Sequence, residues 1–149
     1  MNVSEQMIAE IVRQVLAEKG CAPAADDGIV KQVAPSGVIG IKTANVKMEP
    51  FEGRRDVVLK DLTTLEEAPR MGIGIMELTG KPFEWTLTYD EFDIVLEGHL
   101  EIETDGTIVK AGPGEVIYIP KGTHIHFQTP DYVRYLYTVY PANWADGTN

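Results

Sequence analysis

Two segments bounded by glycines constrain the fold of this chain more than any other feature. The first runs from Gly80 to Gly98 and holds Glu91 seven residues before its closing glycine. The second runs from Gly114 to Gly122 and reads G-E-V-I-Y-I-P-K-G. Glycine permits the positive φ of tight turns, and a proline that closes an apolar run marks the turn that follows. Both segments therefore predict short strands that are joined by tight turns.

The chain from Ile29 onward has the same β-like pattern. Short runs rich in Val and Ile alternate with Gly, Pro and Asp, which is typical of antiparallel sandwiches and barrels. The dipeptide Asp105-Gly106 is the strongest hairpin signal, because both central residues of a type I′ turn need positive φ. Nothing between Ile29 and Tyr140 reads as a long helix. The predicted strands fall at residues 37–43, 56–60, 72–78, 92–97, 99–104 and 131–140.

Composition limits the classes of partner and compartment. A chain of 149 residues with 44% hydrophobic side chains fits one soluble domain with its own core. Its net charge of -10 would repel nucleic acid and anionic lipid, so we expect neither nucleic acid nor a membrane as partner. A single cysteine, Cys21, forms no intramolecular disulfide, and no run of 18 apolar residues appears. These features predict a cytoplasmic protein.

The N-terminal region differs from the rest of the chain. Residues 4–18 place Met, Ile, Val and Leu at the spacing of one helical stripe, and the residues that follow are small, polar and proline-bearing. An isolated helix of this length gains stability only by burying its stripe. It either packs on its own barrel or docks on another protein. The expected division is a docking helix in residues 1–20, a flexible tether in 21–32 and a barrel in 33–149.

The two glycine-bounded segments resemble the signature motifs of the cupin superfamily, G-x5-H-x-H-x3/4-E-x6-G and G-x5-P-x-G-x2-H. The glutamate, the terminal glycines and the P-x-G turn fall in register, but the metal-binding histidines do not. At one allowed spacing Trp85 and Leu87 replace the first two, and at the other Glu84 and Thr86 do. Ile125 replaces the third. The resemblance implies an all-β cupin (jelly-roll barrel), preceded by the short N-terminal helix, with no transition metal in it.

The cupin register points Glu91 into the barrel. The two-residue period of a strand then sends Asp93 inward as well. The two carboxylates could share a proton, hold hydrated Mg²⁺, or pair with Arg134 from the last strand. A solvated barrel mouth with ordinary salt bridges is the alternative. The same period turns Phe92, Ile94 and Leu96 outward, where a second sheet or a second subunit must cover them, and we expect a homodimer.

The H-x-H sequence at His124 and His126 places both imidazoles on one face. With Ile125 inward, both rings face out, where they could bind metal only at a dimer seam or after a one-residue register slip. Surface or interface histidines are therefore favoured, and no metal ligand is assigned.

Aromatic side chains are candidates for ligand contacts. Trp85, Tyr118 and Tyr135 could line the barrel pocket and stack on a bound ligand. Packing within the core is the alternative interpretation for each of them.

Longer strings give a closer resemblance. The run F-E-W-T-L-T-Y-D-E-F-D-I-V-L-E-G at 83–98, I-P-K-G at 119–122 and P-A-N-W at 141–144 resemble the EutQ family of ethanolamine-utilisation cupins. The resemblance covers roughly residues 33–146. It implies association with a bacterial microcompartment, whose cargo often carries a short amphipathic encapsulation peptide. Residues 4–18 fit that form and are expected to bind shell or cargo proteins.

Some members of this family are described as acetate kinases, which implies ATP with Mg²⁺ as the bound species. Glu91 and Asp93 would then hold Mg²⁺, and Arg134, Lys121 or Lys60 would face the phosphates. The sequence has no G-x4-G-K-[ST] loop, so barrel strands must supply any nucleotide site. Two alternatives are a noncatalytic assembly or adaptor protein of the microcompartment and a metal-dependent isomerase or oxygenase. The missing histidines argue against the last.

Overall fold

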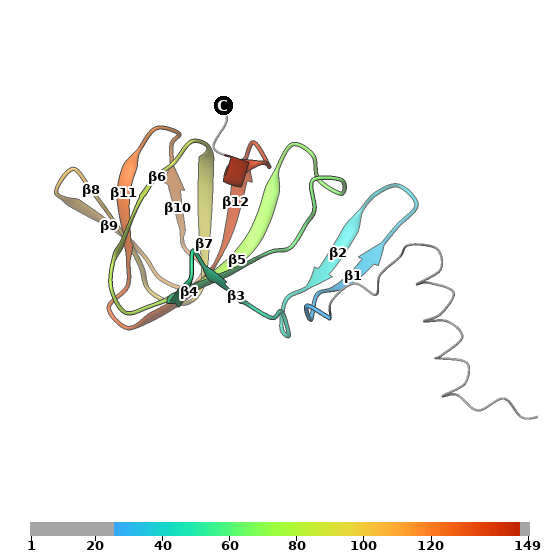
Figure 1. Cartoon of the computed structure of the whole chain (residues 1–149), viewed down its shortest axis with the longest axis horizontal. Coiled ribbons are helices and arrows are strands. Elements are labelled where there is room, and N and C mark those ends of the chain that lie inside the picture. Colours follow the sequence, from blue (N-terminus) through green and yellow to red (C-terminus); the bar gives the residue numbers. More distant parts are fainter. Residues whose placement is uncertain (1–25, 147–149) are drawn as a thin grey trace, which may run out of the picture.

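The computed structural model describes residues 26–146, which form twelve strands and one short 3-10 helix (Figure 1). The predicted helix at 4–18 lies outside the described residues. No helix within 26–146 is long and apolar enough to span a membrane. The elements are β1 (Val30–Val33), β2 (Ile39–Lys42), β3 (Glu49–Phe51), β4 (Arg54–Asp61), β5 (Gly72–Thr79), β6 (Phe83–Thr86), β7 (Asp90–Gly98), β8 (Leu100–Thr104), β9 (Thr107–Ala111), β10 (Val116–Ile119), β11 (His124–Gln128), β12 (Tyr132–Tyr140) and η1 (Trp144–Asp146).

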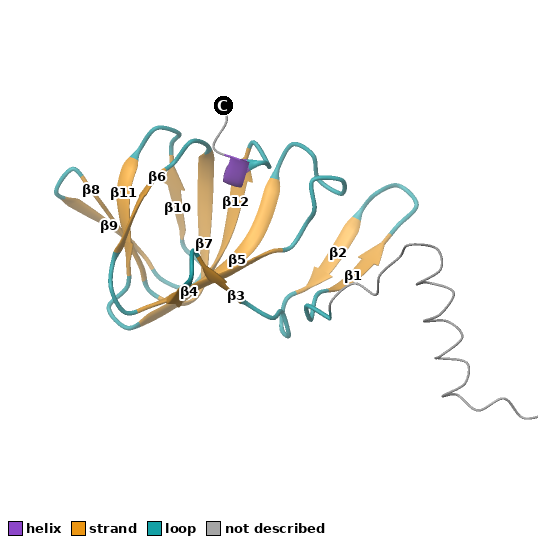
Figure 2. Cartoon of the chain, viewed as in Figure 1, coloured by secondary structure: helices purple, strands orange, loops and turns teal. Residues whose placement is uncertain are grey.

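Two antiparallel sheets form the barrel. The larger has the strand order β10-β7-β12-β5-β4-β3, and the smaller has the order β6-β11-β8-β9. Figure 2 shows strands running between loops at the two ends of the barrel. Apolar side chains from both sheets fill the space between them, because alternate residues of each strand point inward. This confirms the all-β barrel that the sequence predicts. Core residues that are at most 2% exposed include Leu78, Val95, Ile102, Ile125 and Tyr135.

A separate hairpin precedes the barrel. Strands β1 and β2 pair only with each other in the described residues, with Val30 opposite Lys42. Because β1 begins at Val30, the prediction of a tether over 21–32 is wrong for its last three residues, which are strand. A second apolar cluster links this region to the barrel, and in it Ile29 and Ile41 pack with buried Ile75 on the outer face of β5.

The predicted turn between β8 and β9 is confirmed. Thr104 pairs with Thr107, and the two residues between them have positive φ, 49° at Asp105 and 75° at Gly106. This is the backbone of a type I′ hairpin, which fixes the register of the two strands.

Candidate functional site

Strand β7 carries two carboxyl groups into the barrel. Glu91 is 5% exposed and Asp93 is fully buried, whereas Phe92 between them faces outward and is 49% exposed. The inward orientation that the sequence predicts for both acids is therefore confirmed. In the pairing of β7 with β10, the buried side chains Ile119 and Ile117 lie opposite Glu91 and Asp93.

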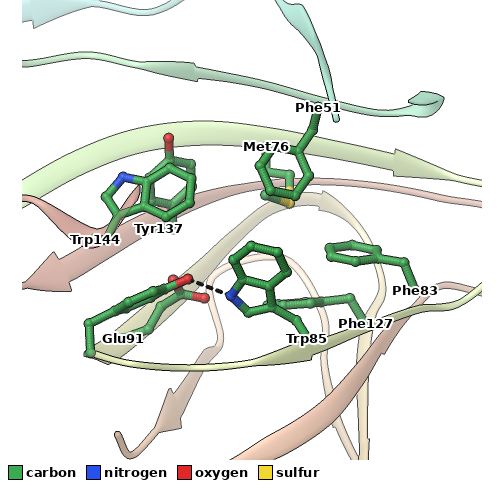
Figure 3. A pocket seen from close by; sticks show the side chains of 9 residues that line it. Phe51, Met76, Phe83, Trp85, Glu91, Phe127, Tyr137 and Trp144 are labelled. Carbon is green, nitrogen blue, oxygen red and sulfur yellow. Dashed lines mark hydrogen bonds between the residues drawn. The ribbon is translucent and has the colours of Figure 1, made fainter. Parts of the chain in front are cut away.

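Glu91 lines a small cavity whose walls are mostly aromatic (Figure 3). The cavity volume is about 20 Å³, which is room for about one water molecule. Aromatic rings therefore fill most of the hollow expected from the sequence. The other lining residues are Phe51, Met76, Phe83, Trp85, Tyr89, Phe127, Tyr137 and Trp144.

Burial dominates the electrostatics of the acidic pair. It raises the pKa of Glu91 to about 7, and interaction with Asp93 partly offsets this rise. Burial also raises the pKa of Asp93 well above its usual range, and the nearby charge of Glu91 raises it further. Neither carboxylate oxygen of Asp93 has a partner at hydrogen-bonding geometry within the described residues. An uncompensated buried charge is costly, so the pair retains at least one proton near neutral pH.

Neighbouring tyrosines do not supply the missing hydrogen bonds of Asp93. Tyr137 lies opposite Asp93 in the strand pairing, but its hydroxyl donates to Asp61 Oδ1 at 2.7 Å. The hydroxyl of Tyr135 donates to the sulfur of Met76 at 2.7 Å. Burial raises the pKa of both phenols, so they stay neutral. A ligand that donates hydrogen bonds, or a cation, would satisfy Asp93.

Arg134 lies on the other side of the sheet from the acidic pair. Its neighbour Tyr135 points inward, so Arg134 faces outward, where it forms an ion pair with Glu77 and donates to the Thr43 carbonyl oxygen at 3.1 Å. The predicted pairing of Arg134 with the inward acids is therefore wrong.

Lys60 also faces outward. Its ammonium group forms an ion pair with Glu49 at 2.5 Å, whereas Val57 and Leu59 of the same strand pack in or against the core. Lys60 therefore faces away from the acidic pair.

Of the three aromatic side chains expected to line the pocket, Trp85 does so, Tyr118 does not, and Tyr135 is fully buried in the core outside the cavity lining. Trp85 lines the cavity, and its indole N–H donates to the Tyr89 hydroxyl at 2.9 Å. Tyr118 is 51% exposed on the outer face, so its expected place in the pocket is wrong. Its ring contacts Phe92, and its hydroxyl donates to Asp90 Oδ1 at 2.9 Å.

Lys121 follows β10 in the turn at the end of the barrel where Glu91 lies, because Ile119 of β10 pairs with Glu91. The backbone N–H of Lys121 donates to Asp90 Oδ1 at 2.9 Å, and this hydrogen bond, followed by that from the Tyr118 hydroxyl, lowers the pKa of Asp90. Of the three predicted phosphate-facing cations, Lys121 lies in a turn, whereas Arg134 and Lys60 occupy the outer faces of strands.

The sequence interpretation did not identify Tyr89 and Trp144 as site residues. Tyr89 lies two residues before Glu91, so the strand period that places Glu91 inward would also have placed Tyr89 inward. Trp144 comes from η1 after the last strand and packs against Tyr89 and Tyr137 at ring-centroid distances of 5.8 and 6.1 Å. No local pattern predicts its return to the barrel.

The donor atoms inside the barrel fit a hard cation better than a transition metal. Ile125, at the position of the third cupin histidine, is fully buried, and Trp85 also supplies no metal ligand. The oxygens of Glu91 and Asp93 are ligands that Mg²⁺ accepts once the pair loses its proton. The unpartnered oxygens of Asp93 fit that use.

Comparison with known proteins gives consistent matches. A family model described as ethanolamine utilisation protein EutQ matches residues 3–146. A Clostridioides difficile (strain 630) protein named acetate kinase EutQ is 43% identical over 150 residues, which cover 97% of this chain and 96% of that protein. A Salmonella typhimurium protein of the same name is 37% identical over 95% of this chain. The chain spans 63% of the length of that relative.

Solved structures agree with these matches. The Clostridium difficile EutQ protein superposes with a TM-score of 0.75 and 45% identity, covering 80% of this chain and 92% of that one. A Salmonella typhimurium LT2 protein described as an ethanolamine utilization protein superposes with a TM-score of 0.73 and 40% identity, covering 77% of this chain and 95% of that one. A Desulfitobacterium hafniense cupin superfamily protein superposes with a TM-score of 0.51 at 17% identity, over 58% of this chain and 79% of that one. This match supports the fold alone. The expected cupin barrel is thereby confirmed.

Proposed function

Because this chain belongs to the EutQ family of ethanolamine-utilisation proteins, we propose that it is an acetate kinase, which converts ATP and acetate to ADP and acetyl phosphate. The observation that carries the proposal is its similarity, over nearly the full length of both chains, to the C. difficile protein named acetate kinase. In the reaction, an acetate oxygen bonds to the γ-phosphorus of ATP, and the bond from that phosphorus to the bridging β-phosphate oxygen breaks. The acidic pair of β7 is the group we assign to the site.

The chemical groups that line the cavity beside Glu91 suit a short carboxylate, but the space must widen to admit one. A protonated Glu91, which lines the cavity, can donate a hydrogen bond to an acetate oxygen, and the surrounding aromatic rings can cover the methyl group. A volume of about 20 Å³ is too small for the four non-hydrogen atoms of acetate. Entry of acetate therefore requires outward movement of a wall residue such as Trp85 or Trp144.

The nucleotide must bind outside the cavity, because ATP is far larger than this space. Its γ-phosphate would approach from the barrel end where Glu91 and Lys121 lie. Lys121 would neutralise phosphate charge, and Mg²⁺ bound to ATP would do the same. If the pair instead loses its proton, Glu91 and Asp93 would hold Mg²⁺ through their carboxylate oxygens, and neither would then donate to acetate.

A coupled assay with ATP, acetate and Mg²⁺ tests this proposal. We expect Glu91→Gln and Asp93→Asn each to lower kcat/KM by about 100-fold, the usual cost of removing an electrostatic contact to the reacting groups. Glu97→Gln is the matched control, because Glu97 is an exposed acid of the same strand. Full turnover in both inward variants would refute the assigned site. Absence of turnover in the well-folded wild-type chain would refute the kinase itself.

A noncatalytic assembly or adaptor role is the second candidate. The nearly filled cavity and the outward orientation of Arg134 and Lys60 favour it, because these leave few cationic groups near the acids. Titration of ¹³C-labelled acetate followed by NMR separates the two candidates. Shifts that are lost in Glu91→Ala support the kinase, and no binding of acetate or ATP supports assembly.

Association with the microcompartment is a separate proposal that depends on the N-terminal sequence. The apolar stripe of residues 4–18 suits docking in a groove on a shell or cargo protein. Deletion of residues 1–20 should leave the circular dichroism of the barrel unchanged and abolish co-sedimentation with purified shells. Equal co-sedimentation of the full and shortened chains would contradict it.

A further inference from the structure

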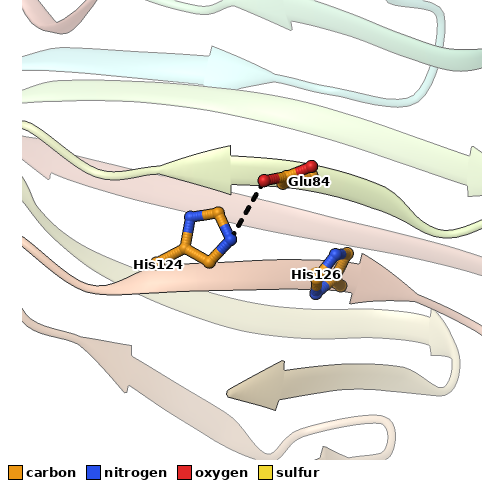
Figure 4. A group of neighbouring side chains, drawn as sticks. All are labelled: Glu84, His124 and His126. Atoms are coloured by element: carbon orange, nitrogen blue, oxygen red, sulfur yellow. Dashed lines mark ion pairs between the residues drawn. The ribbon is translucent and has the colours of Figure 1, made fainter. Parts of the chain in front are cut away.

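Three potential metal ligands meet on the outer face of the smaller sheet (Figure 4). They are Glu84 of β6 and His124 and His126 of β11, and one ligand atom of each lies within 4.8 Å of the other two. Glu84 pairs directly with His126 across the two strands, and the two histidines are two residues apart. Strand pairing therefore places all three side chains on one face.

Neighbouring side chains orient both imidazole rings. Nδ1 of His126 lies 2.8 Å from Oε2 of Glu103, which pairs with His126 from the other side in β8. Nδ1 of His124 lies 2.8 Å from the Thr86 hydroxyl oxygen, and its Nε2 lies 3.1 Å from Oε1 of Glu84. Contacts at Nδ1 leave Nε2 of each ring as the metal-binding nitrogen. A carboxylate on the far nitrogen of a ligating histidine is the usual second contact at metal sites.

We propose that Glu84, His124 and His126 bind one divalent transition metal ion, with Zn²⁺ as the best match. Two imidazole nitrogens and one carboxylate oxygen form a three-ligand set that Zn²⁺ accepts, with a fourth position open to water. The side chains of Glu84 and His124 are 65% and 54% exposed, so that fourth position faces solvent. Ligand atoms around a tetrahedral Zn²⁺ lie roughly 3.3 Å apart. These atoms lie within 4.8 Å of one another, so a shift of about 1.5 Å or less brings them to coordination distance.

This site is distinct from the barrel interior. Ile125, between the two histidines, points into the core and is fully buried, so the metal would lie on the opposite side of the sheet from Glu91. The sequence suggests that these histidines could bind metal only at a dimer seam or after a register slip. Glu84 supplies the third ligand within one chain and in the observed register.

Calorimetric titration of ZnCl2 into the metal-free full chain tests the proposal. We expect one Zn²⁺ per chain, and at least about a 10-fold loss of affinity in His124→Ala and in His126→Ala. Glu103→Gln should weaken binding by about 10-fold while leaving all three ligands in place. His99→Ala is the matched control, because His99 lies outside the cluster. This variant should bind Zn²⁺ with the affinity of the wild type.

Substitution with Co²⁺ gives a second readout, since three protein ligands and a water should produce the visible absorption bands of a near-tetrahedral site. Thermal unfolding without metal checks that each variant is folded. Equal Zn²⁺ affinity in the wild type and the His124→Ala/His126→Ala double variant would overturn the proposal, as would absence of binding to the wild type. Acetate kinase turnover should not change in these variants, so failure here and failure of the kinase proposal are distinguishable.

Discussion

Glu91 and Asp93 lie two residues apart on the inner face of β7, and they are the buried charged residues of the described chain. The cost of burying a charge raises both pKa values above those of an unfolded chain. The folded protein therefore binds more protons than the unfolded chain over the pH range between those values. This relationship makes stability depend on pH in a defined direction.

The acidic pair should stabilise the fold least at high pH. Because the pKa of Glu91 rises from 4.5 to about 7 on folding, its favourable contribution is complete below pH 4.5 and is lost as pH rises through 7. The difference is on the order of 3 kcal/mol, and Asp93 acts in the same direction. Relative to the wild type, Glu91→Gln and Asp93→Asn should gain stability as pH rises from 5 to 8. Urea unfolding across this range measures the difference.

Glu97→Gln provides the control for this pH effect. The change is chemically the same and lies on the same strand, but the side chain is exposed. Its unfolding free energy should run parallel to that of the wild type from pH 5 to 8. Parallel curves for Glu91→Gln and Asp93→Asn would show that the pair carries no excess proton in the fold.

Two glycines with the same positive φ should differ in their tolerance of alanine. Gly98 and Gly106 both have φ of 75°. A Cβ added at Gly98 would lie 1.9 Å from the carbonyl oxygen of Tyr132, whereas a Cβ added at Gly106 would have no described atom within 4 Å beyond its chain neighbours. Gly106→Ala should cost about 1–2 kcal/mol for the left-handed conformation alone. Gly98→Ala should cost clearly more, because the backbone of β12 must also move. Chemical denaturation of both variants measures this, and equal costs would contradict the clash.

The features that the sequence predicts correctly depend on local geometry. The two-residue period of a strand places Asp93 once Glu91 is placed, and the φ requirements of a type I′ turn identify Asp105-Gly106. Neither inference needs knowledge of distant contacts. The same period also orients His124 and His126 outward once Ile125 is inward.

The wrong predictions concern strands whose orientation local sequence does not fix. In V-I-Y-I at 116–119 both faces are apolar, so nothing distinguishes Tyr118 from the inward isoleucines. In Y-V-R-Y-L-Y-T-V-Y at 132–140 apolar or aromatic side chains occur on both faces, so local sequence does not show that Arg134 lies on the outer face. The filling of the cavity depends on Phe51 and Trp144, which lie far apart in the chain and meet only in the folded barrel.

The stacked aromatic core should be sensitive to truncation. The Phe127 ring stacks on Phe83 at 4.9 Å and lies parallel to Tyr135 at 6.3 Å. Phe127→Ala would leave a cavity among these rings and should cost about 3–5 kcal/mol. Ile108→Ala, at a position that is 45% exposed, should cost less than about 1 kcal/mol. Equal urea midpoints for the two variants would show that the core relaxes around the lost ring.

The outer face of β7 and β10 should form the interface of a homodimer. Phe92, Leu96, Val116 and Tyr118 are each 42–53% exposed on adjacent strands, and such an apolar patch gains stability when a second copy covers it. We expect twice the 16.5 kDa chain mass by light scattering for the wild type and the single-chain mass for Phe92→Glu. Val109→Glu, an equally drastic change on the other sheet, should remain dimeric. A wild type that stays at the single-chain mass at the highest concentration reached would refute this interface.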